Sequence, residues 1–127
     1  MLYLDTSATA KLLIEEAESK ALGDYLRSAG TPLVTSRVGI VELRRAGRRI
    51  DAGADRADAL AASLVVVELD ETIERRAITI DPGLRSLDAI HLATALAAAD
   101  SIDGFVCYDV RLATAATALG LTVLAPA

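Results

Sequence analysis

The chain lacks the residues on which several common kinds of site depend. Among its 127 residues there is one cysteine, Cys107, and no tryptophan. A single cysteine excludes internal disulfides and zinc sites built from several thiolates, and its apolar neighbours predict a buried, unreactive thiol. The aromatic residues are only three tyrosines and one phenylalanine, so we expect no platform of several rings for stacking nucleic-acid bases.

Long apolar runs and basic residues are also scarce. No run reaches the length that spans a bilayer, and the N-terminus does not have the pattern of a signal peptide, so we expect a cytoplasmic protein. The formal net charge is −5 and the isoelectric point is about 4.8. Such a chain binds nucleic acid poorly in a non-specific way. A nuclease is not excluded, because metal-binding carboxylates add negative charge, and a basic partner protein would suit this balance.

What is present is an aliphatic sequence in which short strands alternate with helices. Apolar residues make up 53% of the chain, enough for the core of one domain over residues 1–127. The alternation predicts an α/β fold with a mainly parallel sheet of roughly four to five strands between helical layers. We expect strands at 2–4, 33–35, 64–69, 105–108 and 121–124, and helices at 8–16, 17–28, 37–50, 55–62, 71–80, 87–99 and 110–119.

Local signals refine these elements. Ser36, Asp70 and Ser86 each stand directly before an expected helix and are favoured capping residues. The β-branched run at 64–69 is typical of a strand in a sheet that is covered on both faces.

Four acidic residues stand where strands end or helices begin. Asp5 follows the first expected strand, and Asp109 follows the fourth in the same way. Asp88 lies in the first turn of an apolar helix, and Glu42 lies on a helix among aliphatic residues. Ligands of parallel sheets bind outside the carboxyl ends of the strands. We therefore expect these four side chains to gather at that edge.

Two of the acids also have a purely structural interpretation. Asp5 is a favoured residue for capping the next helix, although Thr6 or Ser7 can do so in its place and leave Asp5 free. Asp88 is favourable to the helix dipole in a first turn. The apolar surroundings of its helix indicate instead that Asp88 points into a cleft.

Glu42 is the most informative of the four acids. Burying a carboxylate is costly unless it is paired or coordinates a metal. A pair with Arg45 or Arg49, three and seven residues further along the same helix, is the alternative to a metal. His91, one helical turn after Asp88, we interpret as a structural hydrogen-bonding residue.

Four carboxylates at one edge require a cation. At about 4 Å and an effective dielectric constant of about 20, two carboxylates repel one another by about 4 kcal/mol. Without a cation some of them would take up protons. A set of carboxylates with little histidine favours Mg²⁺ or Mn²⁺. Because such an ion activates water and stabilises charge on a phosphoryl group, the sequence predicts phosphodiester or phosphate chemistry.

Four stretches in this order carry a resemblance to a known family. They are Leu4-Asp5-Thr6-Ser7; Thr35-Ser36 with Glu42-Leu43; Leu87-Asp88-Ala89-Ile90-His91-Leu92-Ala93; and Tyr108-Asp109 with Arg111-Leu112 and Leu119-Gly120-Leu121. At this spacing nearly the whole chain resembles a PIN domain. Within that class it resembles a VapC-type toxin ribonuclease of a toxin–antitoxin pair. The resemblance implies a PIN-like three-layer α/β/α sandwich.

The resemblance also implies a metal-dependent endoribonuclease that hydrolyses RNA phosphodiester bonds. The four acids fall on the family's acidic positions, as ligands of Mg²⁺ or Mn²⁺, some of them through water. Thr6 or Ser7 would orient Asp5 or a water molecule. Family members usually form dimers, and a cognate VapB-type antitoxin blocks the site.

The sequence departs from the family pattern near its last acid. Many relatives have a further Asp two positions after the residue that matches Asp109, where this chain has Arg111, and a Thr where it has Cys107. We therefore expect one firmly held metal and leave a second open. Arg111 would contact a substrate phosphate or lie in solvent. A catalytically inactive PIN-like module that binds RNA or protein is the alternative function.

Most of the basic charge lies on one expected helix. The pairs Arg44/Arg48 and Arg45/Arg49 are like-charged at a spacing of four residues, which costs stability and favours a bound partner. Together with Arg37, this helix is our candidate for contacts to RNA phosphates or for a dimer surface. A solvated helix face is the alternative.

Overall fold

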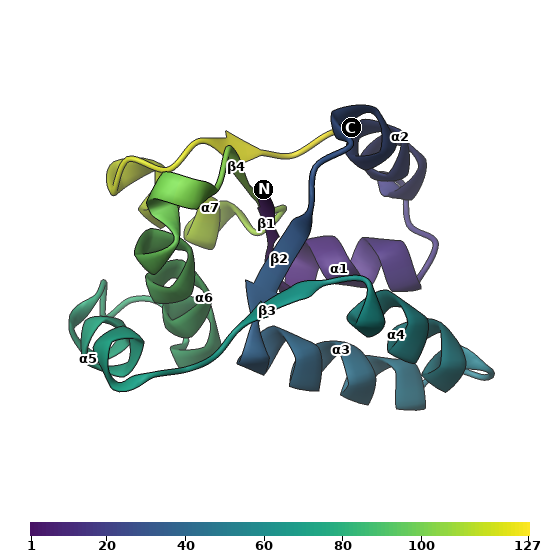
Figure 1. The fold of residues 1–127 in the computed structure, drawn as a ribbon, viewed down its shortest axis with the longest axis horizontal. Coiled ribbons are helices and arrows are strands. Elements are labelled where there is room, and N and C mark those ends of the chain that lie inside the picture. The colour runs from purple at the N-terminus through teal and green to yellow at the C-terminus, as the bar shows by residue number, and fades with distance from the viewer.

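Five short strands form one all-parallel sheet in the computed structural model, which describes residues 1–127 (Figure 1). The order across the sheet is β3-β2-β1-β4-β5. In the register, Tyr3 of the central strand pairs with Val34 on one side and Phe105 on the other. The strands are β1 (Leu2–Leu4), β2 (Leu33–Ser36), β3 (Val65–Val67), β4 (Gly104–Val106) and β5 (Val123–Leu124).

The helices form two layers, one on each side of the sheet (Figure 1). The first four pack on one face and the last three on the other. They are α1 (Thr6–Leu13), α2 (Ser19–Ala29), α3 (Arg37–Arg48), α4 (Gly53–Ala62), α5 (Glu71–Thr79), α6 (Ser86–Ala97) and α7 (Val110–Ala118), with a 3₁₀ turn at Ala99–Ser101. The expected three-layer α/β/α architecture is confirmed. None of the helices has the length and apolar content that a membrane crossing requires.

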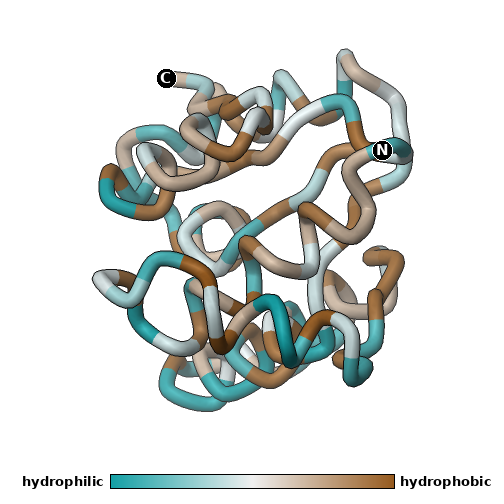
Figure 2. Tube along the Cα trace, turned by 90° about the vertical axis from the view of Figure 1, so that its left-hand side faces the viewer, coloured by the Kyte–Doolittle hydropathy of each residue, from teal (hydrophilic) through white to brown (hydrophobic).

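Side-chain alternation along β1 separates two hydrophobic cores. Leu2 and Leu4 point to the layer of the first four helices. Tyr3, between them, points to the opposite layer and packs with Phe105 and Leu92. The helices that cover these cores carry both hydrophobic and hydrophilic residues within their turns (Figure 2). Both faces of β1 are therefore buried, as is typical of a central strand in a parallel sheet.

The strand at residues 64–69 is shorter and more exposed than its sequence predicts. Only Val65–Val67 pair with a neighbour, and Val65 is 46% exposed. The sheet is covered on both faces, as expected, and Val66 and Val67 of β3 pack against opposite cores. The exposure of Val65 comes with the edge position of β3, which has a neighbouring strand on one side only. A β-branched run reports local strand preference, and its place in the sheet depends on tertiary packing.

Helix capping agrees with the sequence at two positions, differs at a third and decides an open choice at a fourth. Ser36 and Asp70 accept hydrogen bonds from the third residue after them, as expected. Ser86 does not cap α6, because the helix begins one residue earlier than a Ser86 cap allows and Arg85 holds the capping position. The cap of α1 is Asp5 itself and not Thr6 or Ser7, which decides between the two possibilities that the sequence left open.

The strand order reverses beside β1, and this point positions the candidate site. From β1 the chain passes to β2 and β3 on one side, and it then crosses to β4 and β5 on the other. Ligands of open parallel sheets bind at the carboxyl ends of the strands beside such a point. Asp5 directly follows β1, and Asp109 follows β4 before the start of α7.

Candidate metal centre

All four predicted acids line one cavity of about 410 Å³ at the carboxyl edge of the sheet. Asp5 comes from the start of α1, Glu42 from α3, Asp88 from the first turn of α6, and Asp109 from the start of α7. The structure thus brings together side chains from four helices. The rest of the lining is Thr6, Ser7, Ala10, Arg85, Ser86 and Leu87.

Asp5 is the buried centre of this cavity wall, with only 2% of its surface exposed. Its Oδ1 accepts hydrogen bonds from the backbone N–H of Ala8 at 2.9 Å and from the hydroxyl of Ser7 at 2.6 Å. The Ser7 oxygen in turn accepts from the backbone N–H of Tyr108 at 2.9 Å. Ser7 therefore orients Asp5 and joins the end of β1 to the end of β4.

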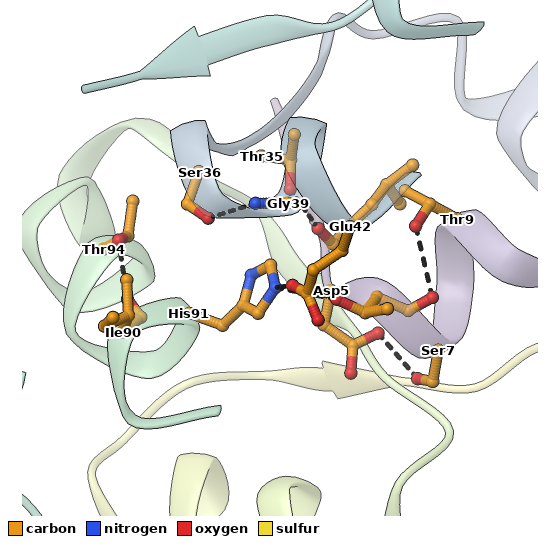
Figure 3. Close-up of polar contacts among 12 residues, drawn as sticks. Asp5, Ser7, Thr9, Thr35, Ser36, Gly39, Glu42, Ile90, His91 and Thr94 are labelled. Carbon is orange, nitrogen blue, oxygen red and sulfur yellow. Dashed lines mark hydrogen bonds and ion pairs between the residues drawn. The ribbon is translucent and has the colours of Figure 1, made fainter. Parts of the chain in front are cut away.

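Glu42 is held by two donors from other helices, Thr6 and His91, and Figure 3 shows His91 beside its carboxylate. Its Oε1 accepts from the Thr6 hydroxyl at 2.6 Å and lies 2.9 Å from Nε2 of His91. On the other side of the ring, Nδ1 lies 2.8 Å from the hydroxyl of Tyr3. A carboxylate only accepts hydrogen bonds, so Nε2 of His91 is the donor to Glu42. In a neutral imidazole Nδ1 is then an acceptor, and the Tyr3 hydroxyl donates to it.

These donors determine the charge on Glu42. Burial raises the pKa of this carboxyl, but hydrogen bonds from His91 and Thr6 lower it by more, and the net shift is downward. Glu42 is therefore an anion at neutral pH. The pair with Arg45 or Arg49 that its sequence allows is not formed. His91 is fully buried and is a structural hydrogen-bonding residue, as interpreted, but its partner is one of the four acids.

Gly39 leaves the space that His91 occupies. A Cβ at this position would stand 3.0 Å from Cε1 of His91 and 2.5 Å from Oγ1 of Thr35. The contact with Thr35 is closer than a side-chain carbon tolerates and the contact with His91 is tight, so glycine at this point of α3 lets the helix approach both side chains.

Asp88 and Asp109 complete the cavity. Burial raises the pKa of Asp88, and repulsion from Asp109, Asp5 and Glu42 raises it further. The charges of the other three acids thus act on Asp88, with which they line the same cavity. Asp109 caps α7 by accepting from the backbone N–H of Leu112 at 2.9 Å.

The donor set fits a hard cation with oxygen ligands. Asp5, Glu42 and Asp109 each use a single carboxylate oxygen in hydrogen bonds to the protein, which leaves the second oxygen free. The Asp88 carboxylate accepts no hydrogen bond from the protein. No three His, Cys, Asp or Glu side chains are already arranged around a single point. An ion held here would take part of its coordination from water, as Mg²⁺ commonly does.

Two of the predicted arginines are engaged in ion pairs. Arg37 makes a two-pronged pair with Glu68, in which its Nε lies 3.0 Å from Oε2. Arg44 lies 3.6 Å from Asp58 on α4. Both side chains are exposed and attach α3 to neighbouring segments.

The other predicted arginines lie at three separate places. Arg48 lines a surface cavity between α3 and α4, and Arg45 lines a different cavity next to the acids. Arg111 is exposed on α7 and donates to the backbone oxygen of Gly83 at 3.4 Å. Arg111 therefore attaches α7 to the loop before α6.

Comparison with known proteins identifies the family. The PIN domain family matches residues 2–117. The chain belongs to the PIN domain family. It is 45% identical over 132 residues to Ribonuclease VapC35 of Mycobacterium tuberculosis, an alignment that covers 99% of this chain and 97% of that protein. The VapC-type resemblance is thereby confirmed.

Solved structures show the same PIN fold. A toxin–antitoxin complex from Klebsiella pneumoniae superposes with a TM-score of 0.77 at 17% identity, covering 100% of this chain and 98% of the other. VapBC2 from Rickettsia felis, solved bound to a DNA fragment of its promoter, gives a TM-score of 0.75 at 11% identity and full coverage of both chains. At these identities the likeness concerns the fold.

The structure adds Arg85 to the lining of this PIN domain's cavity, a residue that sequence reasoning missed. Its signal was its place directly before the helix that carries Asp88. Cys107 is free and buried, and burial raises the pKa of its thiol. The expectation of a buried cysteine is confirmed.

Proposed function

We propose that residues 1–127 act as a single PIN domain that hydrolyses RNA phosphodiester bonds, as the toxin ribonuclease of a toxin–antitoxin pair. The observation that carries the proposal is the cavity at the carboxyl edge of the sheet. Four carboxylates line it, each with an oxygen that accepts no hydrogen bond from the protein. The 45% identity to Ribonuclease VapC35 supports RNA as the substrate.

In this proposal Asp5, Glu42, Asp88 and Asp109 are the metal ligands, and the ion is Mg²⁺ or Mn²⁺. Such an ion supplies positive charge at the phosphoryl group and lowers the pKa of water. The chain's own residues hold the carboxylates still. Ser7 orients Asp5, and the donors on Glu42 hold that carboxylate in its place.

The proposed partners follow from the same comparisons. Two structures that share this fold were solved from toxin–antitoxin systems, which supports a VapB-type antitoxin as inhibitor. The net charge of −5 suits a partner that carries basic side chains. We further propose a homodimer that works in the cytoplasm, where its RNA substrate is found.

Cleavage by purified protein tests the activity. Labelled single-stranded RNA is incubated with wild-type protein in EDTA, Mg²⁺ or Mn²⁺, and we expect cleavage only with a divalent ion. Asp88→Asn keeps the size of the side chain and should lower the cleavage rate by about 100-fold or more. Asp55→Asn is the matched control, because Asp55 also lies in a first helical turn but outside the cavity.

Three results would decide against the proposal or refine it. Cleavage in EDTA at the rate seen with a divalent ion removes the metal from the mechanism, and cleavage by Asp88→Asn at the wild-type rate removes Asp88 from the ligand set. Binding of RNA without cleavage by the wild type would establish the alternative, a catalytically inactive binding module. If cleavage occurs, sequencing of RNA 5′ ends after brief expression, with the Asp88→Asn protein as control, identifies the target.

A further inference from the structure

A second cavity adjoins the carboxylate cavity, and its composition is different. It measures about 500 Å³ and shares three lining residues, Thr6, Glu42 and Leu87, with the carboxylate cavity. The two cavities therefore meet along α1, α3 and the start of α6. The remaining lining is Val38, Val41, Arg45, Ala46 and Arg49.

Two unpaired guanidinium groups line this second cavity. Arg45 and Arg49 stand four residues apart at the C-terminal end of α3 and form no ion pair within the chain. The nearest carboxylates in sequence are Glu42 for Arg45 and Asp51 for Arg49. The Oε1 of Glu42 is held by His91 and Thr6, and Asp51 forms no ion pair with Arg49. Two like charges at this spacing repel each other, so the pair lacks the counter-charge that would offset its cost.

The rest of the arginines on α3 are placed differently. Arg37 and Arg44 are neutralised by Glu68 and Asp58, and Arg48 lines a separate cavity. The uncompensated positive charge of α3 thus lies mainly at the cavity that adjoins the carboxylates. An anion bound there would lie next to the candidate metal centre.

The walls of this cavity suit a nucleotide. Val41 is 52% exposed and Leu87 is 45% exposed, so they offer apolar surface for a base or a ribose. A guanidinium binds phosphate through two parallel N–H donors and stays charged at every accessible pH. Positive charge at this place would also offset the repulsion between the four acids and an RNA strand.

We propose that Arg45 and Arg49 bind the phosphate of the nucleotide that neighbours the scissile bond, with Val41 and Leu87 in contact with its base or ribose. This proposal rests on the proposed ribonuclease function and specifies how the enzyme holds its substrate. The occupant of the cavity is an RNA strand. The charge pair provides binding affinity and orientation, and the chemical step stays with the carboxylates.

A pair of double variants separates this subsite from general charge. Arg45→Gln/Arg49→Gln removes the two cavity arginines. Arg44→Gln/Arg48→Gln removes the same charge, at the same spacing, from the same helix, but outside the cavity. Each is made in wild-type protein for cleavage and in the Asp88→Asn background for binding. The probe is a short, fluorescently labelled single-stranded RNA.

We expect the cavity variant to raise Kd by about tenfold or more, and the control variant to change it by less than about twofold. The slope of log K against log salt concentration should become shallower by about 0.7 for each phosphate that the variant no longer neutralises. In cleavage, KM should rise while kcat stays near the wild-type value, because the two arginines bind the substrate and the transition state equally well. Replacing the flanking phosphate by an uncharged methylphosphonate should weaken binding to the wild-type cavity and not to the cavity variant.

Equal effects of the two double variants would overturn the proposal, and so would equal sensitivity of the wild-type cavity and the cavity variant to the methylphosphonate. If the cavity variant keeps its RNA affinity and loses binding of the purified antitoxin, the cavity is a protein-docking site and the proposal is wrong. Failure of the ribonuclease function gives a distinct pattern, in which the wild type does not cleave RNA while the binding comparison still decides the subsite. If none of the proteins binds RNA, the subsite and the ribonuclease function are both overturned.

Discussion

Glu42 connects the carboxylate cavity to the interior of the protein. Its carboxylate accepts hydrogen bonds from Thr6 and from His91, and the imidazole in turn accepts from the buried hydroxyl of Tyr3. The Tyr3 ring stacks on Phe105 in the core. A carboxylate held in this way needs little reordering when it acts as a ligand.

Replacing Glu42 by Gln should make the protein less stable, in a manner that depends on pH. The pKa of Glu42 is lowered from its usual value of 4.5, so its stabilisation is present above that value and is lost as pH falls through the lowered pKa. In metal-free buffer at pH 7 we expect a loss of about 1 kcal/mol, the difference between charged and neutral hydrogen bonds. Urea denaturation at a series of pH values measures it.

The comparison is sharpened by a control on the surface. Glu74→Gln removes an exposed carboxylate on α5 and should change stability by less than about 0.5 kcal/mol. A deficit in Glu42→Gln that is the same at pH 3 and pH 7 would contradict the proposed charge-dependent network.

The sequence predicts the acids better than it predicts their partners. Asp5 and Asp109 are visible because the end of a strand is a local signal. The contact between Glu42 and His91 joins residues that are 49 positions apart, whereas Arg45 is only three positions away. A local pattern favours the near partner, and only tertiary packing brings the distant one.

At the scale of elements, helix caps explain how Asp5 and Asp109 can combine two roles. Each uses its Oδ1 to accept from a backbone N–H in the first turn of a helix, which fixes the carboxylate while its other oxygen points away from the cap. Asp70 caps α5 with the same geometry but lies outside the carboxylate cavity. A cap is therefore compatible with a ligand and gives no indication of one, which is why the sequence left both interpretations of Asp5 open.

Two substitutions of Asp5 should separate its capping role from its role as a ligand. Serine is nearly as good a cap as aspartate, whereas alanine at the N-cap costs about 1 kcal/mol. We expect Asp5→Ser to keep nearly wild-type stability and Asp5→Ala to lose about 1 kcal/mol, measured by thermal denaturation in EDTA. Both should lose RNA cleavage. Cleavage by Asp5→Ser at the wild-type rate would show that Asp5 only caps the helix.

The boundaries of elements were predicted well where local signals are strong. Ser36 and Asp70 mark true helix starts, whereas Ser86 was mistaken for a cap because it resembles one in sequence. Arg85 holds that position without a side-chain hydrogen bond. Its extended backbone depends on how the preceding loop leads into α6, which no residue pattern reveals.

At the scale of the whole molecule, the alternation of strands and helices was sufficient to predict the three-layer fold. The order of the strands was not predicted. The sequence does not say that β4 pairs with β1 on the side opposite to β2, nor that β3 lies at an edge. That order brings Asp109 beside Asp5 and creates the cavity. The site is thus a product of topology, and its residues become a set only when the chain crosses the sheet.

The proposed metal site would couple cation binding to the stability of the entire domain, because four acids line its cavity. The pKa of Asp88 is raised above its usual value of 3.8, so the folded state penalises its ionised form. That penalty is absent below the usual value and grows as pH rises through the raised pKa. In EDTA at pH 7, Asp88→Asn should therefore be more stable than the wild type, by a few tenths of a kcal/mol because the side chain is partly solvated.

Adding Mn²⁺ should reverse this order. A ligand that binds only the folded state stabilises it by about 2.7 kcal/mol when its concentration is 100 times its Kd. The wild type has all four carboxylates and should show the larger stabilisation. Asp88→Asn lacks one charged ligand and should gain less, so the two unfolding curves cross as the Mn²⁺ concentration rises. Asp55→Asn, which removes a first-turn acid of α4 outside the cavity, should follow the wild type throughout. Equal Mn²⁺ gains in all three proteins would show that the cation binds elsewhere, since only a site that includes Asp88 makes the gain depend on this side chain.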